Sequence, residues 1–211
     1  MSHIEVKWLS DIGIHSTPAA VALRMNELQK HCLTYSPWPA YPFQPQVQVS
    51  IAYNSECIFL QYQVIEQSIK AAHGTINAPV YEDSCVEFFI LFDDEGYYNL
   101  EMNCIGTCLA EFGKNQLNRQ LLPKELIETI KYQSVISKIS PHEIQWELTL
   151  SIPLHLFCYH HPITLKGKNC KANFYKCGDK LPQPHFVSWT HINAPYPNFH
   201  LPSFFGTLTF E

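Results

Sequence analysis

The sequence is poor in charged residues and has no basic stripe. Asp, Glu, Lys and Arg together make up 16% of the 211 residues, and the formal net charge is −5 with both signs mixed along the chain. Because nucleic-acid-binding proteins carry clustered Lys and Arg on one face, nucleic acid is not an expected partner. The low charged fraction also argues against long disordered segments.

Long hydrophobic runs are missing as well. No segment approaches the roughly 18 apolar residues of a membrane span, so a membrane partner is not expected. The first eight residues contain no charged region followed by an apolar one, and no signal peptide is visible. The sequence therefore predicts a cytoplasmic protein, or an extracytoplasmic one if an export signal has been removed.

C-x-x-C pairs are absent, although the sequence has eight cysteines. Without export, these are expected to be reduced thiols packed as small hydrophobic residues. Cys104 and Cys108 could bind a metal ion only with distant partners. Internal repeats and domain-sized linkers are also missing, so residues 1–211 are expected to form a single domain.

What the sequence does contain is typical of a β-rich protein. Aromatic residues reach 13%, and 15 prolines mark turns and edges. Apolar and polar residues alternate with a period of two in many short segments, which indicates strands. The expected strands cover residues 47–53, 58–64, 85–92, 97–104, 108–112, 132–139, 144–152, 169–177 and 205–210. This pattern predicts an all-β fold, a two-sheet antiparallel β-sandwich with jelly-roll or immunoglobulin-like layering.

The N-terminal part differs from the rest. Thr17 is a good helix cap and Pro18 suits the first helical position, and apolar residues then recur at helical spacing. A short helix is therefore expected here, followed by a proline-rich connector over residues 35–42. We expect residues 1–45 to pack on the sandwich. Short helical pieces are also expected near residues 123–127 and 153–157.

An acidic strand is the most informative feature of the sequence. Asp and Glu are disfavoured in strands and rarely buried without a partner, yet three acids adjoin the apolar run 85–92. On the next strand, Tyr98, Leu100 and Met102 are expected to face the core, so Asn99, Glu101 and Asn103 share the other face. These polar groups can bind hydroxyls. The alternative is an ordinary solvated sheet face.

Aromatic side chains beside these polar groups suggest a sugar site. Tyr81 and Trp189 are candidate platforms on which the C–H face of a pyranose ring could lie, with polar neighbours for its hydroxyls. Trp189 falls in a proline-rich, loop-rich tail, where binding residues are common. Core packing is the alternative for Trp189, and it is the expected role of Trp8, Trp38 and Trp146.

Three other kinds of site stay open. Asp93, Asp94 and Glu95 could bind calcium, or could be a charged hairpin tip. Asp83 with Glu87 or Glu101 could be a catalytic carboxylate pair. A haem could be held by a histidine of the His160–His161 pair and by Met102.

Several motifs, in the same order, resemble family 9 carbohydrate-binding modules. Residues 81–89 (YEDSCVEFF) look like the family's W-x-D-D-x-V-E-x-F signature, and residues 97–106 look like the strand that follows it there. The tail over residues 172–206 is similar to the closing N-F-Y-R…W…F-H-x-P-x-x-F-G pattern. The resemblance extends from about residue 47 to residue 210.

The resemblance implies a DOMON-like β-sandwich, of the sugar- and haem-binding type, with structural calcium. In the family two aromatic rings sandwich a terminal sugar, so Tyr81 and Trp189 would be the rings here. Asp83 would accept hydrogen bonds from sugar hydroxyls or organise the loop that carries Tyr81. Tyr81 stands where the family usually has Trp, which makes a smaller platform. Lys176 stands where Arg is common, and lacks the planar fork of that side chain.

The sequence therefore predicts non-catalytic binding of a mono- or oligosaccharide, stacked between Tyr81 and Trp189. The expected hydrogen-bonding residues are Asp83, Glu101, Asn103 and Lys176. The alternatives are a glycan-acting enzyme with a carboxylate pair, a haem-binding electron-transfer domain, and a sandwich whose site has decayed into an interaction module.

Overall fold

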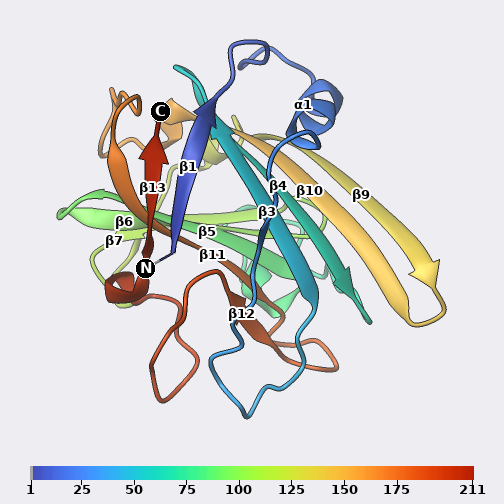
Figure 1. Cartoon of the computed structure of the whole chain (residues 1–211). Helices are drawn as coiled ribbons and strands as arrows, with labels where there is room; N and C mark the ends of the chain where they lie inside the picture. The colour runs from blue at the N-terminus through green and yellow to red at the C-terminus, as the bar shows by residue number, and fades with distance from the viewer. Residues whose placement is uncertain (1) are drawn as a thin grey trace.

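The computed structural model describes residues 2–211, and its main regular secondary structure is β-strand (Figure 1). The strands are β1 (His3–Trp8), β2 (His31–Cys32), β3 (Gln46–Tyr53), β4 (Cys57–Glu66), β5 (Cys85–Asp93), β6 (Gly96–Asn103), β7 (Cys108–Gly113), β8 (Gln120–Leu121), β9 (Lys131–Ser140), β10 (Glu143–Pro153), β11 (Asn169–Cys177), β12 (Phe186–Ser188) and β13 (Gly206–Phe210). The helices are α1 (Pro18–Met25), α2 (Lys124–Ile127) and the single-turn η1 (Val80–Glu82), η2 (Leu154–Leu156) and η3 (Pro202–Phe204). Within this described part, neither α-helix is long and apolar enough to cross a membrane.

The strands form one curled mixed sheet, in which β1 is the junction. Their order is β8-β7-β6-β5-β11-β13-β1-β3-β4-β10-β9, with β12 paired to β11 and β2 to β3. The first part of β1 pairs in parallel with β13, and its last two residues pair in parallel with β3. The expectation of two separate antiparallel sheets is not confirmed, because the short strand β1 hydrogen-bonds to both halves. The mostly β character is as predicted.

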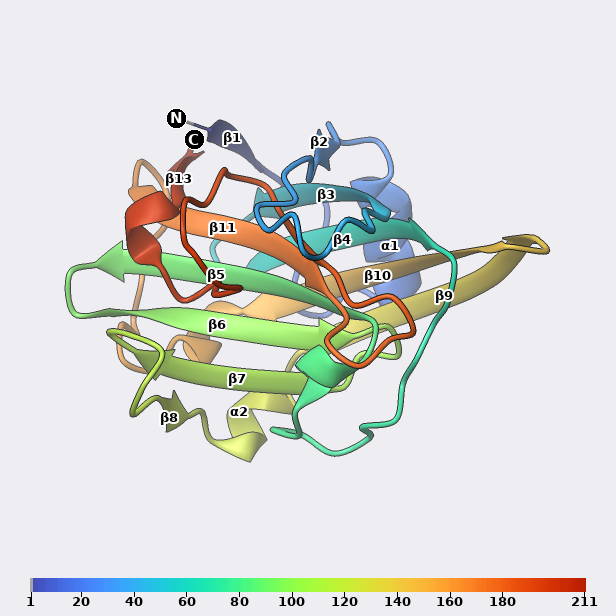
Figure 2. The same ribbon diagram turned by 90° about the horizontal axis from the view of Figure 1, so that it is seen from below.

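The two halves of the sheet pack on each other around the main core. In Figure 2, strands β11, β5, β6 and β7 cross in front of β3, β4 and β10. The predicted alternation holds on both sides: Leu100 and Met102 of β6 face Leu148 and Leu150 of β10 within one buried cluster. The main core therefore lies between the halves, and every second residue of these strands points away from it.

Two smaller apolar clusters cover the outer faces. Helix α1 begins as predicted, with the Ala20 N–H donating to the Thr17 hydroxyl (3.2 Å), and its Val21 and Met25 pack on the outer face of β3 and β4. The proline-rich connector places Trp38 on the outer face of the β5–β11 half, where its indole N–H donates to the Ala194 carbonyl (2.9 Å). The C-terminal tail covers this same face.

Candidate functional site

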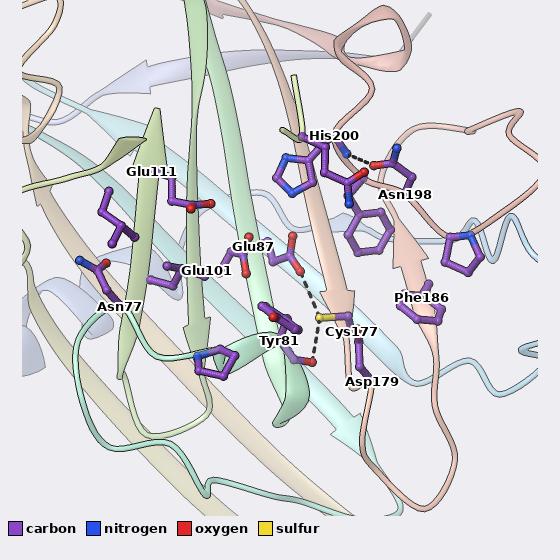
Figure 3. Close-up of a pocket in the computed structure, with 16 residues that line it drawn as sticks. Asn77, Tyr81, Glu87, Glu101, Glu111, Cys177, Asp179, Phe186, Asn198 and His200 are labelled. Carbon is purple, nitrogen blue, oxygen red and sulfur yellow. Dashed lines mark hydrogen bonds between the residues drawn. The ribbon is translucent and has the colours of Figure 1, made fainter. Parts of the chain in front are cut away.

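A cleft of about 510 Å³ opens on the outer face of the β5–β6–β7–β11 half, beside the tail (Figure 3). Its floor is formed by alternate residues of four strands, which are Glu87, Glu101, Leu109, Glu111 and Cys177. One wall is η1 and the loop before it, with Asn77, Pro79 and Tyr81. The other wall is the segment after β11 and the tail, with Asp179, Phe186, Pro197, Asn198, Phe199 and His200.

Strand register brings two carboxyl groups together in the floor. Glu87 of β5 lies directly opposite Glu101 of β6, and both point away from the main core because their neighbours Val86, Leu100 and Met102 point into it. Side chains at directly opposite positions of an antiparallel pair lie close together. The acidic strand that is prominent in the sequence therefore supplies the floor of a cleft.

Glu101 is almost fully buried, and only one of its two carboxyl oxygens has a hydrogen-bond partner. It is 4% exposed, its Oε1 accepts from the Asn99 amide (2.9 Å), and its Oε2 has no hydrogen-bond partner. Burial raises the pKa of Glu101 to about 7, although the Asn99 hydrogen bond acts in the opposite direction. An unpartnered carboxylate oxygen at the floor is a free acceptor for a ligand.

Glu87 has a thiol as its neighbour. The Cys177 thiol donates to its Oε1 (3.1 Å), and burial raises the pKa of Glu87 well above its usual range. Cys85, paired with Cys177 across β5 and β11, completes a group of three potential metal ligands whose atoms lie within 4.8 Å of one another. Among residues 2–211 this is the only such group.

Two of the three predicted calcium ligands contact other groups of the protein. Asp93 accepts from the Glu95 backbone N–H (2.9 Å) and lies 3.1 Å from His160 Nε2, while Glu95 lies 3.7 Å from Lys114 Nζ. The hairpin tip is thus held by its own hydrogen bonds and ion pairs, and Asp94 is exposed. His160, the haem candidate, also contacts the Tyr98 hydroxyl (2.9 Å). Met102 is buried in the main core, as its strand parity predicts.

Arg119 lies outside the cleft and contacts residues at the edge of its floor. Arg119 Nε lies 3.6 Å from Glu111 Oε2, and its guanidinium lies 4.1 Å from the centre of the Tyr97 ring. The same side chain donates to Asn99 Oδ1 (2.6 Å), whose amide in turn binds Glu101. Arg119 therefore positions one carboxyl group directly and a second through Asn99.

Tyr81 is the exposed aromatic surface of the cleft. The residue is 39% exposed, and Figure 3 places its side chain beside Glu87 and Glu101. The Asp179 backbone N–H donates to the Tyr81 carbonyl (3.0 Å), so the two walls are joined at this point. Burial raises the pKa of the Asp179 carboxyl to about 6.

Asp83 and Asn103 organise the wall rather than lining the cleft. The Asp83 carboxylate is fully buried and accepts from the backbone N–H groups of Ala72 and His73 and from the Asn103 amide, each at 3.0 Å. Asn103 also donates to the His73 carbonyl (2.8 Å). The second role considered for Asp83, a loop organiser, is the one that these contacts describe.

Lys176 points to the opposite side of the sheet. Its ammonium is fully buried, 3.0 Å from Glu66 Oε2 and 2.8 Å from His185 Nε2, and Glu66 Oε1 accepts from the Trp146 indole (2.6 Å). Strand parity explains this position, because its neighbours Tyr175 and Cys177 face outward. The prediction that Lys176 binds sugar hydroxyls needs a correction: the ammonium is enclosed by its own partners.

Trp189 is also enclosed. It is 7% exposed and packs in the main core, with its ring edge-to-face against Phe174 at 5.5 Å between centroids. It therefore does not face Tyr81 across the cleft. The aromatic residues opposite Tyr81 are Phe186 and Phe199. Of the expected core tryptophans, Trp38 and Trp146 are buried, whereas Trp8 is 42% exposed.

Two of the six predicted binding residues, Tyr81 and Glu101, line the cleft. Glu87 lines it too, and the sequence pointed to it only as a member of a catalytic pair. Among the residues that sequence reasoning missed are Glu111, Asp179, Asn198, Phe199 and His200. Parity along β7 was a usable signal for Glu111. No sequence signal pointed to the tail residues, because their positions depend on how the loops fold over the sheet.

Comparisons with known proteins identify the family of the chain. The model of carbohydrate-binding family 9 matches residues 18–210, so the chain belongs to this family. A crystal structure of a "putative carbohydrate-binding protein" from Bacteroides uniformis ATCC 8492 is 38% identical, with a TM-score of 0.90 and 99% of each chain covered. No curated protein matches the sequence.

Two further structures are similar in fold alone. Both are family 9 carbohydrate-binding modules from Caldicellulosiruptor kristjanssonii. The one in complex with glucose is 11% identical with a TM-score of 0.56, and covers 100% of this chain and 96% of its own. The one in complex with cellotriose is 12% identical with a TM-score of 0.59, and covers 100% and 94%.

Proposed function

We propose that the cleft binds one sugar residue of a mono- or oligosaccharide, with its ring against Tyr81 and its hydroxyls hydrogen-bonded to Glu87 and Glu101. The observation that carries the proposal is the pairing of a half-exposed ring with a buried carboxylate oxygen that has no partner. The volume of the cleft, about 510 Å³, lies within the usual range for small-molecule sites. Family membership and the sugar complexes of the similar modules support the same function.

The chemistry of the cleft suits a hydroxyl-rich ring. The exposed ring of Tyr81 can cover C–H groups, while carboxylate oxygens accept hydrogen bonds from hydroxyls. The loop that carries Tyr81 is fixed by Asp83, so this wall is ordered before a ligand arrives. This arrangement replaces the predicted sandwich between Tyr81 and Trp189 with a platform on one side and the tail on the other.

Calorimetry with a panel of monosaccharides and cello-oligosaccharides tests the proposal. We expect Tyr81→Ala to weaken binding about tenfold or more, because an aromatic contact contributes on the order of 1 kcal/mol beyond the apolar area that it buries. Tyr196→Ala is the matched control, since this tyrosine is 78% exposed and does not line the cleft. Equal affinity of both variants, or no binding of any sugar by the unmodified protein, would refute the proposed site.

The carboxyl pair favours a second candidate, an enzyme that acts on a glycan. Glu87 and Glu101 lie opposite each other in one cleft, and a carboxyl group with a pKa near 7 is suited to donate a proton at neutral pH. Release of reducing sugar from oligosaccharides, abolished by Glu101→Gln, would support this candidate. Binding without release would leave the non-catalytic function.

A further inference from the structure

We infer that the cleft selects amino sugars, in which a protonated amine replaces a hydroxyl, over neutral sugars and uronic acids. This inference rests on the proposed function and names the class of sugar that the same site takes. Three features of the cleft support it: the charges of the lining residues, the partners that the neighbouring cations already have, and one carboxyl oxygen without a hydrogen-bond partner.

The lining carries carboxyl groups but no lysine or arginine. The four acids are Glu87, Glu101, Glu111 and Asp179. The one histidine of the lining, His200, is held neutral, because burial and the nearby Arg119 lower its pKa to about 3. The carboxylate of a uronic acid would therefore find no lysine or arginine to pair with among the lining residues, which disfavours its binding.

The neighbouring cations are already engaged with other acids. Arg119 pairs with Glu111, Lys176 with Glu66, and Lys180 Nζ lies 2.7 Å from Glu82. Among the ion pairs of residues 2–211, none includes Glu87, Glu101 or Asp179. Three carboxyl groups of the cleft are thus left without a cationic partner from the protein itself.

Glu101 shows where an ammonium group would gain most. Its Oε2 is buried without a partner, while its other oxygen is taken by Asn99. A hydroxyl would supply one donor, whereas an ammonium supplies three donors together with a positive charge. Hydrogen bonds between ionised partners are roughly twice as strong as neutral ones. A bound ammonium would also favour the ionised form of the surrounding carboxyl groups.

Three sugars of nearly the same shape and different charge test the inference: glucosamine, glucose and glucuronic acid. Calorimetry near pH 6.5 keeps an ordinary amine protonated. We expect glucosamine to bind about tenfold or more tightly than glucose, and glucuronic acid most weakly. Raising NaCl from about 0.05 M to about 0.5 M should weaken glucosamine binding much more than glucose binding.

Charge-removing variants tie the preference to the cleft. Glu101→Gln and Asp179→Asn should each reduce the ratio of the glucose and glucosamine dissociation constants severalfold. Glu5→Gln removes the same charge from an exposed position of β1 and should leave that ratio unchanged. Far-UV circular dichroism checks that each variant is folded.

The possible outcomes separate the two proposals. Glucose binding as tightly as glucosamine overturns the amino-sugar inference and leaves sugar binding intact. No binding of any sugar overturns both. A glucosamine preference that persists unchanged in both cleft variants also overturns the inference, because the selecting charge would then lie elsewhere.

Discussion

Glu101 shows how a single buried carboxyl group couples binding to stability. Burial makes its ionised form unfavourable, so the folded protein holds the Glu101 proton more tightly than the unfolded chain does. The stabilising effect of that proton is present at low pH and is lost as the pH rises. The free acceptor that we assign to the ligand is therefore also a source of instability when no ligand is bound.

We predict that Glu101→Gln stabilises the protein at alkaline pH but not at acidic pH. The folded-state pKa is about 7 against an ordinary value of 4.5, so stability should fall across this interval in the unmodified protein. The amide of Gln does not ionise, and the variant should be more stable by about 3 kcal/mol at pH 8, at roughly 1.4 kcal/mol for each unit of pKa shift.

Urea unfolding of both proteins between pH 4 and pH 8 measures this difference, and subtracting the two curves cancels the titration of the groups that do not interact with Glu101. The Glu5→Gln variant should give a difference close to zero at all pH values. A Glu101→Gln difference that does not grow with pH would contradict the raised pKa.

At the residue scale, the alternation of side chains along a strand predicted which face of the sheet a residue lies on, but not which residues surround it there. The alternation of β6 correctly placed Leu100 in the core and Glu101 on the other face. Lys176 could not be placed, because its burial depends on Glu66 of β4, which is distant in sequence. Trp189 follows a short strand with no alternation, and its position is decided by packing on Phe174.

At the scale of elements, the turn between β6 and β7 depends on one glycine. Gly106 has a φ of +89°, and a Cβ at this position would overlap the ring of Tyr132 from β9. We expect Gly106→Ala to destabilise the fold by about 1–3 kcal/mol, the usual effect of overpacking. Gly74→Ala is the control and should change stability by less than about 1 kcal/mol, because nothing lies within 4 Å of the added atom.

Thermal or chemical unfolding of the two glycine variants decides the point. Equal stability of both would mean that the turn and Tyr132 adjust to the extra methyl group. A large loss of stability in Gly74→Ala would instead show that the loop before η1 depends on the backbone conformation of Gly74.

The elements themselves could be predicted when they were long and regular. Strands β3, β4 and β10 alternate clearly and lie close to their predicted bounds. Strands β1, β2, β8 and β12 were not predicted; β2 and β8 have two residues and β12 has three, which is too short for an alternation to show. The closure of the sheet through β1 could therefore not be predicted, since parallel pairing leaves no mark in a six-residue strand.

At the scale of the whole molecule, both halves of the sheet contribute to one core. Because Ile4 and Val6 of β1 lie in this core and β1 pairs with both halves, neither half can unfold without exposing the other. We expect a single cooperative transition, in which tryptophan fluorescence and far-UV circular dichroism coincide. Two separated transitions would mean that the halves are independent units and would contradict the single domain expected from the sequence.

The fixed wall of the cleft has a consequence for the rates of binding. Asp83 holds the loop before η1, and the Asp179 backbone bonds to Tyr81, so the platform needs no rearrangement before a ligand enters. Encounter rates should then be much the same for related sugars of equal charge, and the time for which each of them stays bound should determine which one is selected.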